Sequence, residues 1–125
     1  MFLDTTFLIS LAEEIQAGVV GPARLFLSRN RRHVHHVTVI SLGEIAAGMP
    51  RNQTARDFLA KFRIVTLKPE IALEAANIDR VLMRTGQRLG ENDNWIAGFA
   101  RYYGEPLVSN DLAFDRVPGL RRIHL

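Results

Sequence analysis

The stretch that decides the fold is FLDTTFLISLAEEIQA, residues 2–17. Two apolar residues that suit a strand are followed at once by Asp4, and apolar residues then recur at helical spacing. We therefore expect a short strand at Phe2–Leu3 that stops at Asp4, and a helix over Thr5–Ala17. An acidic residue at the end of a strand or the start of a helix recurs along the chain.

The rest of the chain continues the alternation of short strands and helices. Because no repeat or flexible linker divides it, we expect one domain over residues 1–125. This alternation favours an α/β fold with a parallel sheet covered by helices on both faces. Further strands are expected at His36–Thr38, Ile64–Leu67, Pro106–Val108 and Arg122–His124, and further helices at Pro22–Arg29, from a cap at Ser41 to Gly48, at Asn52–Lys61, from Pro69 to near Gly86, and from Asp93 through Tyr103.

The composition indicates a soluble protein. Hydrophobic residues make up 47% of the chain and charged residues 23%, which is ordinary for a globular domain. No apolar run approaches the roughly 20 residues of a membrane span, and the N-terminus carries no export leader. The absence of cysteine excludes disulfides, thiolate metal sites and cysteine nucleophiles. We expect a cytoplasmic protein without membrane contact.

The basic residues are almost all arginine. The net charge is +3, and 14 of the 16 basic residues are Arg. The planar guanidinium suits bidentate contacts to phosphate, so this bias is consistent with a nucleic-acid partner. A general preference of the source genome for Arg explains the bias equally well.

Four carboxylates follow the strand-to-helix pattern, and each has a structural explanation when taken alone. Asp4 and Asp93 suit helix N-caps, and Asp111 suits a turn. Glu44 lies three residues after Ser41 and has no basic partner on its own helix, so it is either the acceptor of a capping box or a buried site residue. Asp57, by contrast, precedes Lys61 by four residues and is explained by an exposed ion pair.

Taken together, the four carboxylates predict a metal site. Sites in parallel sheets lie just beyond the carboxyl ends of the strands, so these side chains are expected to share a small volume. Two like charges about 4 Å apart repel by roughly 4 kcal/mol at an effective dielectric near 20. Such a cluster requires protonation or cations, and an all-oxygen set favours Mg²⁺ or Mn²⁺ over Zn²⁺.

The sequence resembles the PIN-domain ribonucleases, in particular the VapC-type toxins of bacterial and archaeal toxin–antitoxin pairs. Each matching motif is weak alone, but the motifs occur in order at the family's spacing over nearly the whole chain. They are FLDTTFLI at residues 2–9, VISLGEIAAG at 39–48, NDNWIA at 92–97 and LVSND at 107–111, followed by Phe114 and VPGL at 117–120.

The resemblance implies a single PIN-like domain with a five-stranded parallel sheet, an acidic pocket for one or two divalent ions, and RNA as the substrate. It also implies a cognate antitoxin that blocks the pocket, and a homodimer. Carried over by position, the catalytic and metal-binding residues are Asp4, Glu44, Asp93 and Asp111, with Mg²⁺ as the cofactor and Mn²⁺ as a substitute. Thr6 and Ser109 stand where the family has small supporting polar residues, and Asp115 is a lower-ranked alternative acid.

Basic residues outside the motifs offer candidate RNA contacts. Arg80, Arg84 and Arg88 are expected on one stripe of the long helix, opposite its apolar face. RNA phosphate is one partner for such a stripe, and a solvated surface is the alternative. His33 and His35 precede the strand expected at residues 36–38. Alternation of side chains puts them on one face, where they could bind a transition metal incidentally.

Two classes of function fit these observations. The leading hypothesis is a Mg²⁺-dependent endoribonuclease that acts as the toxin of a VapBC-type pair. The alternative is a catalytically silent PIN-like module that binds RNA or protein, which the retention of all four acids disfavours. A phosphatase of the haloacid-dehalogenase type would need a second acid two residues after Asp4, where this chain has Thr6.

Overall fold

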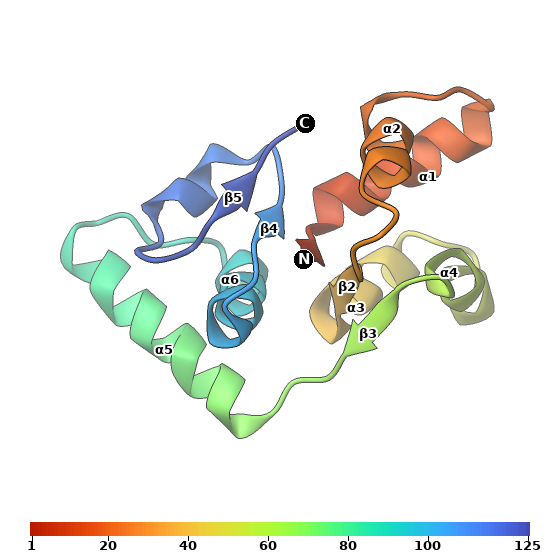
Figure 1. Ribbon diagram of the computed structural model, residues 1–125. Coiled ribbons are helices and arrows are strands. Elements are labelled where there is room, and N and C mark those ends of the chain that lie inside the picture. The colour runs from red at the N-terminus through yellow and green to blue at the C-terminus, as the bar shows by residue number, and fades with distance from the viewer.

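Five short strands form the centre of the molecule in a computed structural model that describes all of residues 1–125 (Figure 1). The strands are β1 (Phe2–Leu3), β2 (His36–Thr38), β3 (Arg63–Val65), β4 (Leu107–Val108) and β5 (Arg122–Ile123). The helices are α1 (Thr5–Ala17), α2 (Pro22–Arg29), α3 (Val39–Ala47), α4 (Asn52–Leu59), α5 (Pro69–Arg84) and α6 (Glu91–Tyr103), with a short 3₁₀ helix η1 (Leu112–Arg116).

The sheet has the strand order β3-β2-β1-β4-β5, and every pair of neighbours is parallel. Phe2 of β1 lies opposite His36 of β2 and Leu107 of β4, so β1 is the central strand. Because all strands run the same way, their carboxyl ends meet at one edge, which we call the carboxyl edge. The predicted α/β fold with a five-stranded parallel sheet is confirmed.

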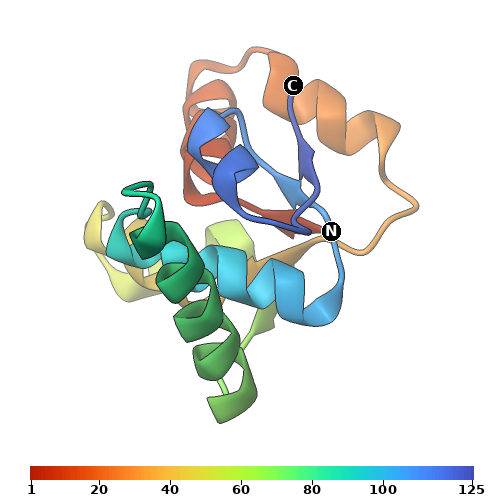
Figure 2. The same ribbon diagram turned by 90° about the vertical axis from the view of Figure 1, so that its left-hand side faces the viewer.

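Two hydrophobic clusters cover the two faces of the sheet, because side chains alternate along each strand. Phe2 and Leu107 point to the cluster with α5, α6 and η1, whereas Leu3 and Val108 point to the cluster with α1–α4. Figure 2 shows α5 beside α6, with α1 and α2 on the other side of the strands. Helices on both faces leave the carboxyl edge open for a site.

Several element boundaries differ from the sequence predictions. The prediction that Ser41 caps its helix is wrong: α3 begins at Val39, and the Thr38 hydroxyl accepts the Ser41 backbone N–H at 3.0 Å. Strand β3 lies at Arg63–Val65 instead of Ile64–Leu67, in register with His36–Thr38. Helix η1 has no counterpart in the predictions.

The structure also corrects two expectations about surface charges. Helix α5 ends at Arg84 and is followed by Gly86 with φ 68°, so Arg88 lies beyond the helix and not on its stripe. The predicted pair of Asp57 with Lys61 does not form. Asp57 instead accepts a hydrogen bond from Gln53 at 2.8 Å.

Helices α5 and α6 pack against each other and lie across one another (Figure 2). Glu74 pairs with Arg101, and the Asn94 amide donates to the Ala75 carbonyl at 2.9 Å. Gly98 allows the close approach of the two helices, since a Cβ atom there would lie 2.9 Å from the Ala75 Cβ. None of the helices combines the length and apolarity needed to span a membrane.

The contact at Gly98 predicts that Gly98→Ala destabilises the protein. The added Cβ would meet the Ala75 side chain at 2.9 Å and its backbone at 3.2 Å, and overpacking of this kind costs about 1–3 kcal/mol. Urea denaturation of the wild type and the variant measures this loss in the free energy of unfolding.

The matched control is Gly43→Ala in α3. A Cβ at Gly43 meets nothing within 4 Å, and Ala is the better helix former by about 1 kcal/mol. This variant is expected to be at least as stable as the wild type. Equal stability of the two alanine variants would contradict the close packing of α5 against α6.

Candidate active site

Asp4 is the buried centre of the polar residues at the carboxyl edge. Asp4 follows β1 directly and is only 2% exposed. Its Oδ2 accepts hydrogen bonds from the Ser109 hydroxyl at 2.7 Å and the Thr6 hydroxyl at 2.8 Å, and its Oδ1 accepts the Thr5 backbone N–H at 2.8 Å. Burial raises the pKa of the Asp4 carboxyl, and these hydrogen bonds only partly oppose the rise.

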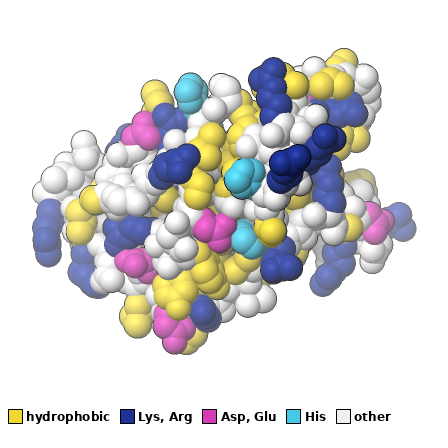
Figure 3. Space-filling model, viewed as in Figure 1, with side chains coloured by type: hydrophobic (Ala, Val, Ile, Leu, Met, Phe, Trp, Pro, Cys, Tyr) yellow, Lys and Arg dark blue, Asp and Glu magenta, His cyan; other side chains and the backbone are white.

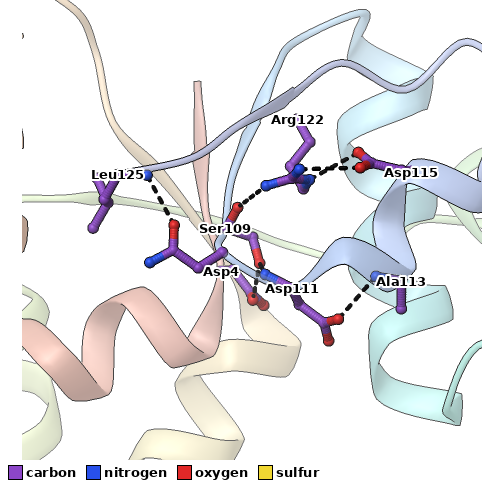
Figure 4. Close-up of polar contacts among 8 residues, drawn as sticks. Asp4, Ser109, Asp111, Ala113, Asp115, Arg122 and Leu125 are labelled. Carbon is purple, nitrogen blue, oxygen red and sulfur yellow. Dashed lines mark hydrogen bonds and ion pairs between the residues drawn. The ribbon is translucent and has the colours of Figure 1, made fainter.

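Ser109 connects Asp4 to Asp111 across the end of β4. The Ser109 hydroxyl donates to Asp4 and accepts the Asp111 backbone N–H at 3.0 Å (Figure 4). Asp111 also caps η1, because its Oδ1 accepts the Ala113 N–H at 2.9 Å. The turn role predicted for Asp111 is therefore present, and its second carboxylate oxygen makes no hydrogen bond to the protein.

Glu44 reaches the same edge from α3, but not as a capping-box residue. Its Oε1 accepts a hydrogen bond from the Thr5 hydroxyl at 2.8 Å, and that hydroxyl also lies 2.9 Å from the Ser41 hydroxyl. Glu44 is exposed, so the prediction of a buried side chain is wrong. The contact with Thr5 aims the carboxylate across the sheet toward the end of β1.

Asp93 lies in the first turn of α6 and is not its N-cap, since that position belongs to Gly90. The Asp93 carboxylate has no hydrogen-bond partner in the protein. Burial raises its pKa from an ordinary 3.8 to about 6, with further contributions from the negative charges of Asp4, Asp111 and Glu44. All four predicted acids are therefore close enough to influence one another.

The four carboxylates have no basic partner. None of the five ion pairs of the structure includes any of them. No three His, Asp or Glu side chains converge tightly enough to form a ready-made cation site. Negative charges that are neither paired nor bridged spread apart, which is what Coulomb repulsion requires. The arrangement is an acidic cluster whose net charge only a proton or an external cation can reduce.

The basic residues singled out in the sequence differ in their contacts. Arg84 is the last residue of α5. Arg88 makes a bidentate ion pair with Asp79 at 2.9 Å, and Arg80 donates to Asn77. Arg84 makes no such contact. Figure 3, which faces the amino ends of the strands, shows basic side chains over α5 and also on the opposite side of that face.

The three neighbouring histidines do not form a metal site. His33 and His35 precede β2, which begins at His36. The His35 ring packs against Phe62, whereas His36 contacts Glu105 at 3.0 Å. These side chains have separate partners, and they do not form a cluster with three or more ligands.

Sequence reasoning missed the role of two buried hydroxyls behind Glu44: Thr5 was not singled out, and Ser41 was expected only as a helix cap. Both were visible as polar residues on apolar helix faces: Thr5 precedes the buried Leu8 by three residues, and Ser41 precedes the buried Ile45 by four. It also missed the contact of Arg122 with the Ser109 carbonyl at 3.0 Å. Asp115, the alternative acid, pairs with Arg122 and does not join the cluster.

The raised pKa of Asp93 predicts how stability changes with pH when no divalent cation is present. The folded state binds the Asp93 proton more tightly than the unfolded state does. The stability that this proton contributes is therefore fully present below the ordinary pKa of 3.8, and it is lost as the pH rises through about 6. We expect Asp93→Asn to gain stability relative to the wild type across this window. Urea denaturation at a series of pH values measures the difference.

Asp57→Asn serves as the control for this titration. Asp57 is an exposed carboxylate on α4 that lies outside the cluster. The difference in the free energy of unfolding between Asp57→Asn and the wild type should vary less over the same pH window. A constant difference between Asp93→Asn and the wild type at all pH values would contradict the shared electrostatics of the four acids.

Comparison with known proteins agrees with the geometry. A family model described as PIN domain matches residues 1–120. The chain is 33% identical over 124 residues to ribonuclease VapC2 of Haemophilus influenzae. The matched residues make up 95% of this chain and 92% of that protein. It is 28% identical over 103 residues to the tRNA(fMet)-specific endonuclease VapC of Salmonella typhimurium, or 78% of each.

The fold is also found among solved structures. VapBC2 from Rickettsia felis, bound to a promoter DNA fragment, matches with a TM-score of 0.83 at 22% identity, over 98% of this chain and 96% of that chain. The likeness shows that the two proteins share the fold over nearly the whole chain. The chain belongs to the PIN domain family.

Proposed function

We propose that this chain is a divalent-cation-dependent endoribonuclease and the toxin of a toxin–antitoxin pair. The observation that carries the proposal is the set of four carboxylates at the carboxyl edge without a basic partner. An enzyme that hydrolyses phosphodiesters needs groups that offset the negative charge of the phosphate. Carboxylates cannot do so themselves, but they can hold the cations that do.

The residues fit a hard divalent cation. The donor set consists of carboxylate oxygens with hydroxyls beside them, and contains neither sulfur nor histidine nitrogen, which favours Mg²⁺ or Mn²⁺. The pKa of Asp93, raised to about 6 by burial and by the neighbouring negative charges, leaves this side chain mostly ionised at neutral pH. The cation would supply charge relief and activation of water for phosphodiester hydrolysis.

The protein's own contribution is to orient the ligands. Asp4, Glu44, Asp93 and Asp111 would hold the cation. Asp4 is fixed by Thr6 and Ser109, and Glu44 is fixed by Thr5. Hydrogen bonds of this kind to the ligands typically decide metal affinity by 10–100-fold.

The identity of the substrate rests on the relatives. The Haemophilus influenzae and Salmonella typhimurium proteins are named as a ribonuclease and a tRNA-specific endonuclease. An RNA substrate would bring phosphates to the carboxyl edge, and Arg84, at the end of α5, has no carboxylate partner that would compete with them. Arg88 is less available because Asp79 neutralises it.

We infer an antitoxin partner and a homodimer as well. The Rickettsia felis and Salmonella typhimurium structures are VapBC assemblies. The outer face of α5 carries exposed apolar side chains that an interface would cover: Leu73 is 67% exposed and Met83 is 52% exposed. Size-exclusion chromatography of the chain alone and with a co-expressed neighbouring gene product tests both inferences.

The proposal predicts that Asp4→Asn abolishes RNA cleavage. The substitution removes a ligand charge at a position fixed by three hydrogen bonds, and loss of a metal ligand should lower activity at least as much as loss of a supporting contact, about 10–100-fold. Labelled RNA incubated with purified protein and Mg²⁺ or Mn²⁺ gives the rate, and single-stranded DNA tests specificity.

Asp57→Asn is the matched control and should cleave like the wild type. Removal of divalent cations with a chelator should stop cleavage, and their return should restore it. Cleavage that survives both Asp4→Asn and chelation would overturn the proposal. RNA binding without cleavage by any preparation, unchanged in Asp4→Asn, would instead identify a silent binding module.

Arg84→Gln is expected to weaken RNA binding with little effect on the rate at saturating RNA. Loss of one phosphate contact lowers the slope of log affinity against log salt by roughly 0.7 for a single strand. Binding of catalytically inactive Asp4→Asn with and without the second substitution measures this slope over a salt series.

The control for this measurement is Arg32→Gln. Arg32 is exposed and precedes β2, so it lies toward the amino ends of the strands, away from the acids. Its removal should leave the slope closer to the parent value. Equal effects of the two substitutions would indicate attraction by the general charge of the protein and not by a contact beside the acidic cluster.

A further inference from the structure

Arg122 is a largely buried guanidinium beneath the acidic cluster. It begins β5, at the edge of the sheet, and its side chain is 12% exposed. Nε and Nη2 donate to the two carboxylate oxygens of Asp115 at 2.8 and 3.0 Å, and Nη1 donates to the Ser109 carbonyl at 3.0 Å (Figure 4). A buried cation is costly unless its donors are used, and here all three of these nitrogens have a partner.

The hydrogen bond from Arg122 to the Ser109 carbonyl takes the place of a backbone hydrogen bond that the β4–β5 ladder does not form. The Ser109 N–H donates to the Ile123 carbonyl at 2.9 Å, so a continued parallel ladder would pair the Ser109 carbonyl with the N–H of Leu125. The Leu125 N–H instead donates to the Asn110 side chain at 2.8 Å. The Arg122 guanidinium therefore satisfies a carbonyl that would otherwise lack a partner at the end of β4.

Ser109 links the Arg122 side chain to the acids, because it is bonded to both. Its backbone is held on one side by Ile123 and Arg122, and its hydroxyl contacts Asp4 and the backbone of Asp111 on the other. A rotation of the peptide after Ser109 would move both contacts at once. No other side chain in the structure bonds to the Ser109 carbonyl.

We propose that Arg122 is a positioning residue of the acidic site, which holds the peptide after Ser109 so that Asp4 and Asp111 can share a cation. This inference rests on the proposed function. Asp115 orients the guanidinium and is itself 54% exposed, so its own charge needs no partner. Arg122 makes no hydrogen bond or ion pair with a carboxylate of the cluster, although the charge of Asp111 helps to raise the pKa of its guanidinium; its direct contact with the residues that hold the acids is the bond to Ser109.

A simpler role for Arg122 would be to tie η1 to β5 through Asp115. The two roles make different predictions for two variants. Arg122→Ala removes both the ion pair and the contact with Ser109, whereas Asp115→Asn weakens the ion pair and leaves Arg122 able to reach Ser109. If the ion pair alone matters, the two variants will be equally impaired.

The test is the affinity of the metal-free protein for Mn²⁺, measured by calorimetry on the full chain, with RNA cleavage as a second readout. We expect Arg122→Ala to bind Mn²⁺ about tenfold more weakly, as for other residues that support metal ligands. The loss of Mn²⁺ affinity in Asp115→Asn should be clearly smaller. Millimolar guanidinium, compared with sodium at equal ionic strength, should restore part of the affinity of Arg122→Ala by occupying the vacated space.

Rescue by guanidinium separates positioning from general stability, because guanidinium weakens folded proteins and would lower the affinity of a merely destabilised variant. Unchanged Mn²⁺ affinity in Arg122→Ala, or equal losses in both variants without rescue, would overturn the inference. If Arg122→Ala does not fold, Arg122→Lys takes its place: it keeps the charge but loses the fork, and wild-type affinity in this folded variant would overturn the inference equally.

The outcome also distinguishes this inference from the proposed function. A wild-type protein that neither binds Mn²⁺ nor cleaves RNA would overturn the proposed function, and the role of Arg122 with it. A wild-type protein that does both, alongside an Arg122→Ala variant of equal Mn²⁺ affinity, would overturn only the inference about Arg122.

Discussion

The rest of the structure depends on the parallel register of β1 and β4, which ends both strands at the same edge. Asp4 follows one strand and Ser109 the other, and the hydrogen bond of 2.7 Å between them joins segments more than a hundred residues apart. Helix α6 brings Asp93 close enough for the charges of Asp4 and Asp111 to raise its pKa. An antiparallel pairing of the same strands would place the two polar residues at opposite edges and disperse the site.

The position of Asp4 serves the fold and the site with the same carboxylate. Its Oδ1 accepts the first N–H of α1, while its Oδ2 accepts the hydroxyls of Thr6 and Ser109. An N-cap contributes about 1 kcal/mol, which offsets part of the cost of burying a charge. The reading of Asp4 as a cap and its reading as a site residue are therefore compatible, because a carboxylate has more acceptor positions than a cap uses.

The sequence predicted the order of elements and the common edge of the acids because both follow from short-range patterns. It failed where a choice depended on contacts distant in the chain. Ser41 and Thr38 are both good caps, and the end of β2, fixed by pairing with β3, selects Thr38. The partner of Arg122 follows from the place where the β4–β5 ladder stops, which no local pattern encodes. Hydrogen bonds between buried hydroxyls, such as that of Thr5 with Glu44, were hidden for the same reason.

The cluster combines one buried carboxylate held by three hydrogen bonds with three others that have fewer hydrogen bonds or none. Asp4 is buried and held by three hydrogen bonds, whereas Glu44 and Asp111 are exposed and Asp93 has no hydrogen-bond partner. Without a cation, repulsion keeps such side chains from converging, in agreement with the absence of a ready-made site. Ordering a long acidic side chain costs up to about 2 kcal/mol of conformational entropy. A fixed Asp4 avoids that cost for one ligand, and the less tightly bonded carboxylates avoid the larger cost of holding four like charges together without a cation.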